Sequence, residues 1–129
     1  MKLTNFELTN HFAPALHQLA KIKTSPINAF KISKAINVVN ENISVFNNAR
    51  LSIIDNYCEK DEAGKFKENS ETKEYIFKSD DEKLKCINEI NELSNIEIEL
   101  NINPVKLKDF NGTEMTAEML FSLGEFITE

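Results

Sequence analysis

The stretch Ser25–Tyr57 decides the fold, and it reads SPINAFKISKAINVVNENISVFNNARLSIIDNY. Serine followed by proline favours a helix start, because the serine side chain caps the first turn and proline needs no hydrogen bond there. Apolar residues then recur at spacings of three and four, which indicates a helix packed along one heptad seam. A helix of about 30 residues spans roughly 45 Å, long enough to protrude or to pair with a second copy. The seam comprises Ala29, Ile32, Ile36, Val39, Ile43, Phe46, Arg50, Ile53 and Tyr57.

Arg50 is the one polar residue of this seam. A buried guanidinium without a partner is very costly, so two interpretations follow. In the first, Arg50 extends its head to solvent or pairs with an acid of the same chain. In the second, it sets register or partner choice at a helix–helix interface. Together with Phe46, Ile53 and Tyr57, it marks the part of the seam that we predict to be an interface.

The N-terminal residues indicate short helices. Thr4–Glu7 has the form of a capping box, in which the threonine and glutamate side chains each satisfy a backbone N–H. Proline deep in a helix costs about 3 kcal/mol, so we expect a break near Phe12–Pro14. A second short helix should run through Leu16–Ala20, with Lys21–Thr24 as a connection.

After Tyr57 the pattern changes to that of turns and strands. Asp61–Gly64 has turn chemistry, with a glycine available for a positive φ. Aromatic residues lie in two β-prone runs, Lys65–Lys67 and Lys73–Lys78, joined by the polar stretch Glu68–Thr72. We therefore predict a two-stranded hairpin with a loose tip.

A helix and a strand should follow the hairpin. Ser79–Glu82 forms a second capping-box pattern, and the apolar spacing predicts a helix to about Asn95. Ile96–Asn103 alternates strictly between apolar and polar residues, which is typical of a strand with one buried face. Its other face carries Glu97 and Glu99, which we predict to be part of an interaction surface.

The last residues indicate a short closing helix. Val105, Leu107 and Phe110 fit an extended or single-turn segment, and Asn111–Gly112 fits a turn. Thr113 or Thr116 then caps a final helix. The apolar residues of that helix are Met119, Leu120, Leu123, Phe126 and Ile127.

Composition and charge limit the classes of function. The 129 residues, 41% of them hydrophobic, suffice for one domain with a buried core. No apolar run approaches the roughly 20 residues of a membrane helix, so no membrane association is expected. Residues 1–58 carry six cations and three acids, and residues 59–129 carry nine cations and eighteen acids. Direct nucleic-acid binding is not expected, because it needs clustered lysine or arginine. We predict a single α+β domain, helical over 1–58 and mixed over 59–129.

No residue set indicates catalysis, a cofactor or a metal. His11 and His17 are six positions apart and would not share a helix face, and no third ligand accompanies them. The isolated glycines exclude the usual phosphate-binding loops. Cys58 and Cys86 lack metal spacing and fit two free thiols in a cytosolic protein, with a single disulfide as the alternative. We therefore expect a protein that is not an enzyme.

Short motifs along the chain are shared with a known group of proteins. They are Pro14–Leu16, Leu19–Ala20, Ala29–Ile32, Asn48–Leu51, Asp55–Tyr57, Glu59–Lys65 (EKDEAGK), Tyr75–Phe77, Ile96–Ile102 and Thr116–Phe126. In these motifs the chain resembles a family of small, uncharacterised tailed-bacteriophage proteins. A glycine often follows the tyrosine in that family, whereas Cys58 follows it here. The resemblance covers nearly the whole chain and implies no catalytic residues. It implies a phage setting, in the host cytoplasm or the virion.

Two functions follow as expectations. The first is a non-enzymatic virion or assembly protein that binds another protein or itself through the long helix. The second is a phage-encoded inhibitor of a host defence or nucleic-acid enzyme, which would use an acidic face around Glu97 and Glu99 in imitation of a phosphate backbone. Glu89 and Glu92 of the preceding helix would extend that face.

Overall fold

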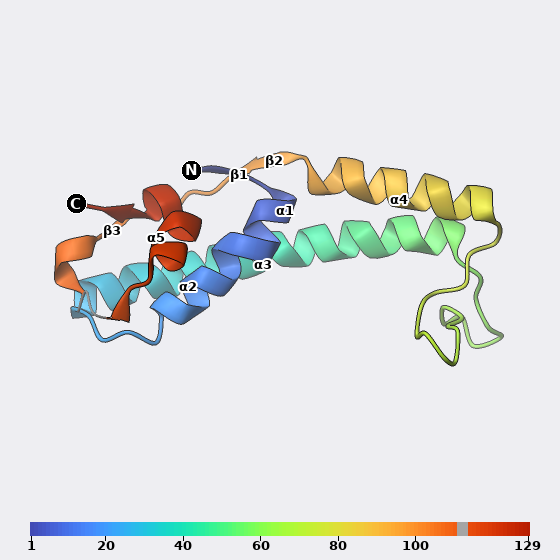
Figure 1. Ribbon diagram of the computed structural model, residues 1–129, viewed down its shortest axis with the longest axis horizontal. Coiled ribbons are helices and arrows are strands. Elements are labelled where there is room, and N and C mark those ends of the chain that lie inside the picture. Colours follow the sequence, from blue (N-terminus) through green and yellow to red (C-terminus); the bar gives the residue numbers. More distant parts are fainter. Residues whose placement is uncertain (111–113) are drawn as a thin grey trace. The chain divides into compact units, whose positions relative to one another are not determined.

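The chain forms two compact units in the computed structural model, which describes residues 1–110 and 114–129 (Figure 1). Unit 1 comprises Met1–Ser44 and Ile96–Glu129, and unit 2 comprises Val45–Asn95. The expected α+β class is confirmed. The single domain over residues 1–129 stays a prediction, because each unit is described by itself. Within the described residues, no helix combines the length and apolarity needed to cross a membrane.

The long helix α3 runs unbroken from Pro26 to Tyr57, as the sequence predicts. Its start is capped as expected, since the Ser25 Oγ accepts a hydrogen bond from the Asn28 N–H at 3.3 Å. The buried Asn28 amide donates to the Thr24 Oγ1 (3.2 Å), which in turn donates to the Asp109 carbonyl oxygen (3.1 Å). This chain of bonds ties the start of α3 to the C-terminal part of unit 1.

The N-terminal residues form one nearly continuous helical run after a short strand. The predicted capping box is present: the Thr4 Oγ1 accepts from the Glu7 N–H, and the Glu7 carboxylate accepts from the Thr4 N–H. The predicted break near Phe12–Pro14 is wrong. A π-helical turn intervenes, and Pro14 then takes the second position of α2, where the first turn of a helix tolerates proline. The elements are β1 (Lys2–Thr4), α1 (Asn5–Glu7), η1 (Leu8–Phe12) and α2 (Ala13–Leu19).

Two small sheets hold the ends of the chain in unit 1. Strand β2 (Glu97–Glu99) pairs antiparallel with β1, and Leu3 lies opposite Ile98. Strand β3 (Val105–Lys106) pairs in parallel with β4 (Ile127–Thr128). The predicted strand Ile96–Asn103 is therefore present in its first half, but its partner is the N-terminal strand and not the hairpin.

The C-terminal elements follow the predicted order. The segment after β3 makes one 3-10 turn, η2 (Leu107–Asp109). Thr116 caps α5 (Ala117–Leu123), with its Oγ1 accepting from the Met119 N–H at 3.1 Å. The alternative cap Thr113 and the predicted Asn111–Gly112 turn lie outside the described residues. The helix ends where Gly124 adopts φ +50°, and η4 (Gly124–Phe126) follows.

The core of unit 1 lies between the N-terminal helices, the first part of α3 and α5. The rings of Phe12 and Phe126 meet edge to face, with their centroids 6.0 Å apart. α5 packs against η1 and α2. Buried members of this core include Leu8, Phe12, Leu16, Leu19, Ile32, Ala35, Val39, Leu100, Val105, Phe110, Met119, Leu123 and Phe126.

Unit 2 consists of the end of α3, a looped segment and helix α4 (Asp80–Ser94). The helix confirms the prediction, and the Ser79 Oγ accepts from the Glu82 N–H at 3.1 Å. The two runs of the predicted hairpin do pair antiparallel, through the Glu68–Tyr75 bridge and a hydrogen bond from the Ile76 N–H to the Lys67 carbonyl oxygen (2.9 Å), but they form bridges and not regular strands. Polar side chains shape both of its turns: the Asp61 and Asn69 Oδ1 atoms each accept two backbone N–H groups.

Candidate functional site

The helices of unit 2 pack side by side and run in opposite directions (Figure 1). Ile54, Cys58 and Cys86 are buried between them. The Tyr57 hydroxyl donates a hydrogen bond to the Glu89 Oε1 at 2.8 Å and so links the two helices. This bond raises the pKa of Tyr57, because the carboxylate stabilises the protonated hydroxyl, and burial adds to the shift.

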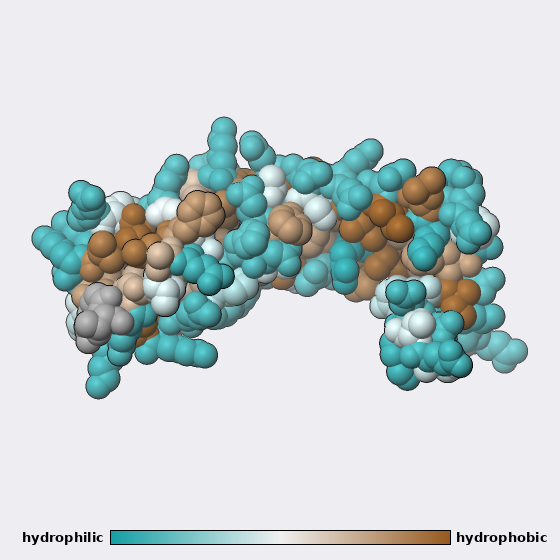
Figure 2. Space-filling model, viewed as in Figure 1, coloured by the Kyte–Doolittle hydropathy of each residue, from teal (hydrophilic) through white to brown (hydrophobic). Residues whose placement is uncertain are grey.

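Apart from Val45 at the start of unit 2, three apolar side chains of this helix pair are exposed, and we name these three the apolar flank. They are Leu51 of α3, 42% exposed, and Leu84 and Ile87 of α4, 58% and 43% exposed. Figure 2 shows apolar side chains gathered over both helices of unit 2. A pair of helices alone cannot cover more than one side of each member, which explains why this flank is left open.

Helix geometry places Leu51 and Ile87 on the same side of the pair, and it places Leu84, one turn before Ile87 and about 160° from Cys86, on the adjoining outer face of α4. At 100° per residue, Leu51 is rotated about 60° from the buried Ile54, and Ile87 about 100° from the buried Cys86, in the same sense. In two antiparallel helices, residues that are rotated in the same sense from the contact face lie on the same side of the pair. Tyr57 and Glu89 are rotated in the opposite sense, and their hydrogen bond therefore lies on the other side of the pair.

The predicted interface residues of α3 lie mostly inside the fold. Phe46 is buried, and Ile53 and Tyr57 are half-buried. Arg50 is exposed and takes no part in the ion pairs found across residues 1–110 and 114–129. An exposed guanidinium needs no buried partner, in agreement with the interpretation that its head extends to solvent. Its role in partner choice stays a prediction.

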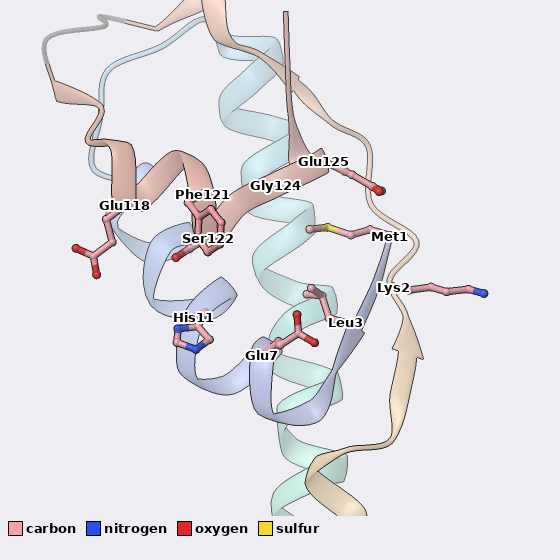
Figure 3. A pocket seen from close by; sticks show the side chains of 10 residues that line it. All are labelled: Met1, Lys2, Leu3, Glu7, His11, Glu118, Phe121, Ser122, Gly124 and Glu125. Atoms are coloured by element: carbon pink, nitrogen blue, oxygen red, sulfur yellow. The ribbon is translucent and has the colours of Figure 1, made fainter.

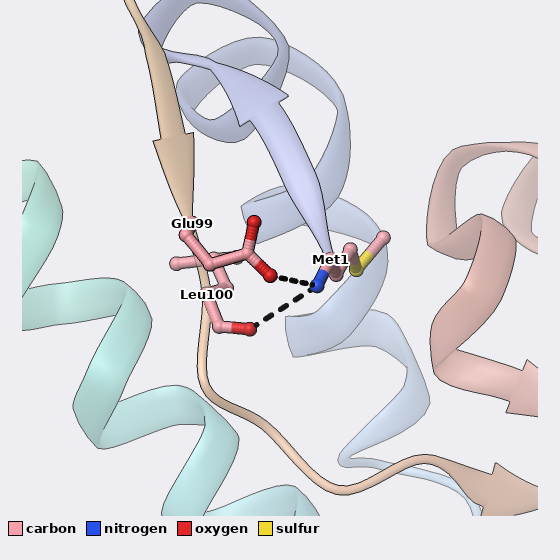
Figure 4. A network of polar contacts seen from close by, with 3 residues as sticks. All are labelled: Met1, Glu99 and Leu100. Carbon is pink, nitrogen blue, oxygen red and sulfur yellow. Dashed lines mark hydrogen bonds and ion pairs between the residues drawn. The ribbon is translucent and has the colours of Figure 1, made fainter.

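Glu97 and Glu99 lie exposed on β2 in unit 1. Figure 4 shows how Glu99 is held: its Oε1 accepts from the Met1 amino group at 3.0 Å, and the same amino group lies 3.4 Å from the Leu100 carbonyl oxygen. One negative charge of the predicted acidic face is therefore paired. Glu89 and Glu92 belong to unit 2, so an acidic face that includes them stays a prediction.

A second surface is a pocket of about 470 Å³ in unit 1, which we name the edge pocket. It lies between β1 on one side and α5 on the other (Figure 3). Sequence reasoning missed it, because its two walls come from opposite ends of the chain. The lining residues are Met1, Lys2, Leu3, Glu7, His11, Glu118, Phe121, Ser122, Gly124 and Glu125.

The histidines and cysteines have distinct surroundings. His11 is exposed beside the edge pocket, and its ring meets the Phe6 ring at 75° with the centroids 5.8 Å apart. His17 is exposed. Cys58 and Cys86 are free thiols, and burial raises the pKa of both. A search of the described ranges finds no group of three or more His, Cys, Asp or Glu residues placed to hold a metal ion.

Comparison with known proteins yields no match: no protein-family model, curated protein or solved structure is similar to the chain. The resemblance to small phage proteins therefore depends on the quoted residues and stays a prediction.

Proposed function

We propose that this protein acts by binding other proteins and not by catalysis, and that it self-associates through the apolar flank of unit 2. The single observation that carries the proposal is the exposure of Leu51, Leu84 and Ile87 on the two helices of unit 2. Two such units placed flank against flank form a four-helix arrangement, the common way in which helix pairs cover their apolar sides.

The surroundings of the flank favour a second copy as the partner. By helix spacing, Asn47 and Asn48 of α3 and Asn91 of α4 lie beside it, and none of them is charged. Three acids lie beside it by the same spacing: Asp55 is paired with Lys60, Asp81 is paired with Lys85, and Asp80 is exposed near Leu84. Two of these three acids are paired with lysines, so the flank is less negative than the balance of the whole chain suggests.

The setting that we propose is a tailed-phage particle or its assembly in the host cytoplasm, where many copies lie close together. A contact too weak to persist between two free chains becomes effective when neighbours are held at high local concentration. Light scattering tests self-association directly, since the mean mass should rise above 14.7 kDa with concentration. A constant mass of one chain at the highest attainable concentration would contradict the proposal. The particle setting predicts that the chain co-purifies with phage particles.

A second candidate function is inhibition of a host defence or nucleic-acid enzyme. The observation that favours it is the exposed carboxylate of Glu97, near the paired Glu99 on the same strand. Such an inhibitor would compete with DNA for its target enzyme. The test is a competition assay at low salt against a host nuclease, with Glu97→Gln as the variant. Inhibition that is equal for the wild type and for Glu97→Gln would exclude this use of the acidic strand.

A further inference from the structure

Strand β1 has one paired edge and one open edge. The Met1 carbonyl oxygen accepts from the Leu100 N–H (2.8 Å), and the Asn5 N–H donates to the Ile96 carbonyl oxygen (3.1 Å). In an antiparallel pair, the hydrogen-bonding groups of successive residues point to alternate edges. The N–H and C=O of Lys2 therefore point away from β2. An open edge of this kind is a template for a further strand.

The edge pocket lies beside this open edge. Figure 3 shows β1 between β2 and the pocket, and α5 forms the opposite wall. An extended chain added to β1 would run along the pocket and place alternate side chains into it. The pocket volume of about 470 Å³ is ample for one or two such side chains.

The walls of the pocket define the chemistry of the occupant. Met1, Leu3 and Phe121 supply apolar surface, and the Phe121 side chain is 89% exposed. Glu118 and Glu125 extend from the α5 side and point outward in different directions (Figure 3). Glu7 adds a third acid, although one of its oxygens already accepts hydrogen bonds from Thr4. Lys2 is the one lysine or arginine of the lining, so the pocket is acidic on balance.

We infer that the edge pocket binds an extended peptide segment of a partner protein, in which apolar residues alternate with lysine or arginine. The segment pairs with the backbone of Lys2, its apolar side chains contact Phe121 and Leu3, and its cations lie near Glu118 and Glu125. A second copy of this chain is a poorer occupant, because each copy would bring the same three glutamates to the contact. The inference depends on unit 1 alone, and it stands whether or not the apolar flank has a partner.

The test uses a six-residue peptide of alternating lysine and valine with blocked ends, titrated into the full chain and followed by NMR. We expect the amide signals of Lys2, Leu3, Phe121 and Gly124 to shift, with a Kd of about 0.1–1 mM, as suits a short peptide on one strand edge. Two control peptides separate the sources of affinity. N-methylation of every backbone amide should weaken binding at least about tenfold, because it removes strand pairing but keeps the charge. Glutamate in place of lysine should abolish binding.

Variants of the chain complete the test. Phe121→Ser removes an exposed ring without disturbing the core, and we expect it to weaken binding about tenfold. The double variant Glu118→Gln and Glu125→Gln should weaken it several-fold and reduce its salt dependence. Glu62→Gln, an exposed acid of unit 2, is the matched control and should change nothing. Equal binding of the methylated peptide, or shifts that avoid the pocket, would overturn the inference. Pocket signals that shift with protein concentration alone would assign the pocket to a second copy and overturn it as well.

Discussion

The substitution Leu84→Asn tests the proposed self-association most directly. The three residues of the apolar flank together expose about one and a half complete side chains per copy, so two copies cover about three on association. At about 2–3 kcal/mol for each buried side chain, the gain is about 6–9 kcal/mol. Association costs at least about 4 kcal/mol in lost freedom, which leaves at most about 2–5 kcal/mol, or a Kd between about 0.2 and 30 mM.

Loss of Leu84 should weaken this dimer measurably. Its uncovered part is 58% of the side chain, worth about 1.5 kcal/mol in each copy. A symmetric contact contains the residue twice, so the loss lies between about 1.5 and 3 kcal/mol, or about 10- to 100-fold in Kd. The assay is the concentration dependence of amide signals between about 0.05 and 2 mM, where a dimer of this strength is partly formed. The signals of Leu51 and Ile87 should shift with concentration in the wild type and stay fixed in the variant.

The matched control is Val45→Asn. Val45 is 66% exposed on α3, but six residues before Leu51 it points about 120° away from the flank. The two variants introduce the same residue and remove similar amounts of exposed apolar surface, although leucine favours a helix more than valine does. If Val45→Asn weakens association as much as Leu84→Asn, or if wild-type flank signals do not move up to about 2 mM, the reasoning from the flank is refuted.

Four further predictions concern stability. Phe126→Ala should lower the free energy of unfolding by about 3–5 kcal/mol, because it empties the space beside Phe12. The surface substitution Phe121→Ala should change that free energy by no more than about 0.5 kcal/mol. Urea unfolding measures both variants, and equal losses would contradict the assigned core. Thr4→Ala should cost about 1 kcal/mol through loss of the capping box, measured by thermal unfolding, and no loss would show that the box is not formed. Gly124→Ala should cost about 1–3 kcal/mol, since φ +50° with ψ −123° strains any residue with a Cβ; an unchanged melting temperature would contradict that backbone conformation. The buried thiols of Cys58 and Cys86 have raised pKa values, so these thiols ionise first in the unfolded chain as the pH rises through about 9. The contribution of the two thiols should leave the free energy of unfolding constant below that pH and lower it above that pH. A flat profile up to about pH 10 would contradict the burial of the thiols.

The helices were predictable because their signals are local. Ser25, Ser79 and Thr116 each occupy a cap position, and in each case the side chain accepts a backbone N–H three residues on. A cap and a periodic apolar face lie within one segment, so a short window of sequence contains both. Pro14 shows the limit of this reasoning. Its usual effect is to break a helix, but the π-helical turn before it shifts the hydrogen bonding so that it lies in the first turn of α2.

The strand pairing was not predictable for the opposite reason. β1 has three residues, too few to show an alternating pattern, and its partner β2 lies near the other end of the chain. The alternation of Ile96–Asn103 indicates which side chains are buried but not which strand lies beside them. The hairpin was the nearest segment with β-prone residues, and proximity in sequence made it the natural expectation. In the structure, its residues form bridges within unit 2, whereas β2 belongs to unit 1.

The candidate surfaces could not be predicted for the same reason, since they depend on contacts between distant parts of the sequence. The heptad seam identified residues that need cover, and Phe46, Ile53 and Tyr57 obtain it wholly or partly within the chain. A surface that remains for a partner is made of apolar residues that the fold leaves uncovered, and Leu51 lies off the seam. Such residues are recognisable only once the packing of both helices is known. The edge pocket is even less predictable from sequence, because no single stretch of sequence contains both of its walls. Its acidic lining and open strand edge become a peptide-binding surface only when the first residues of the chain lie beside α5.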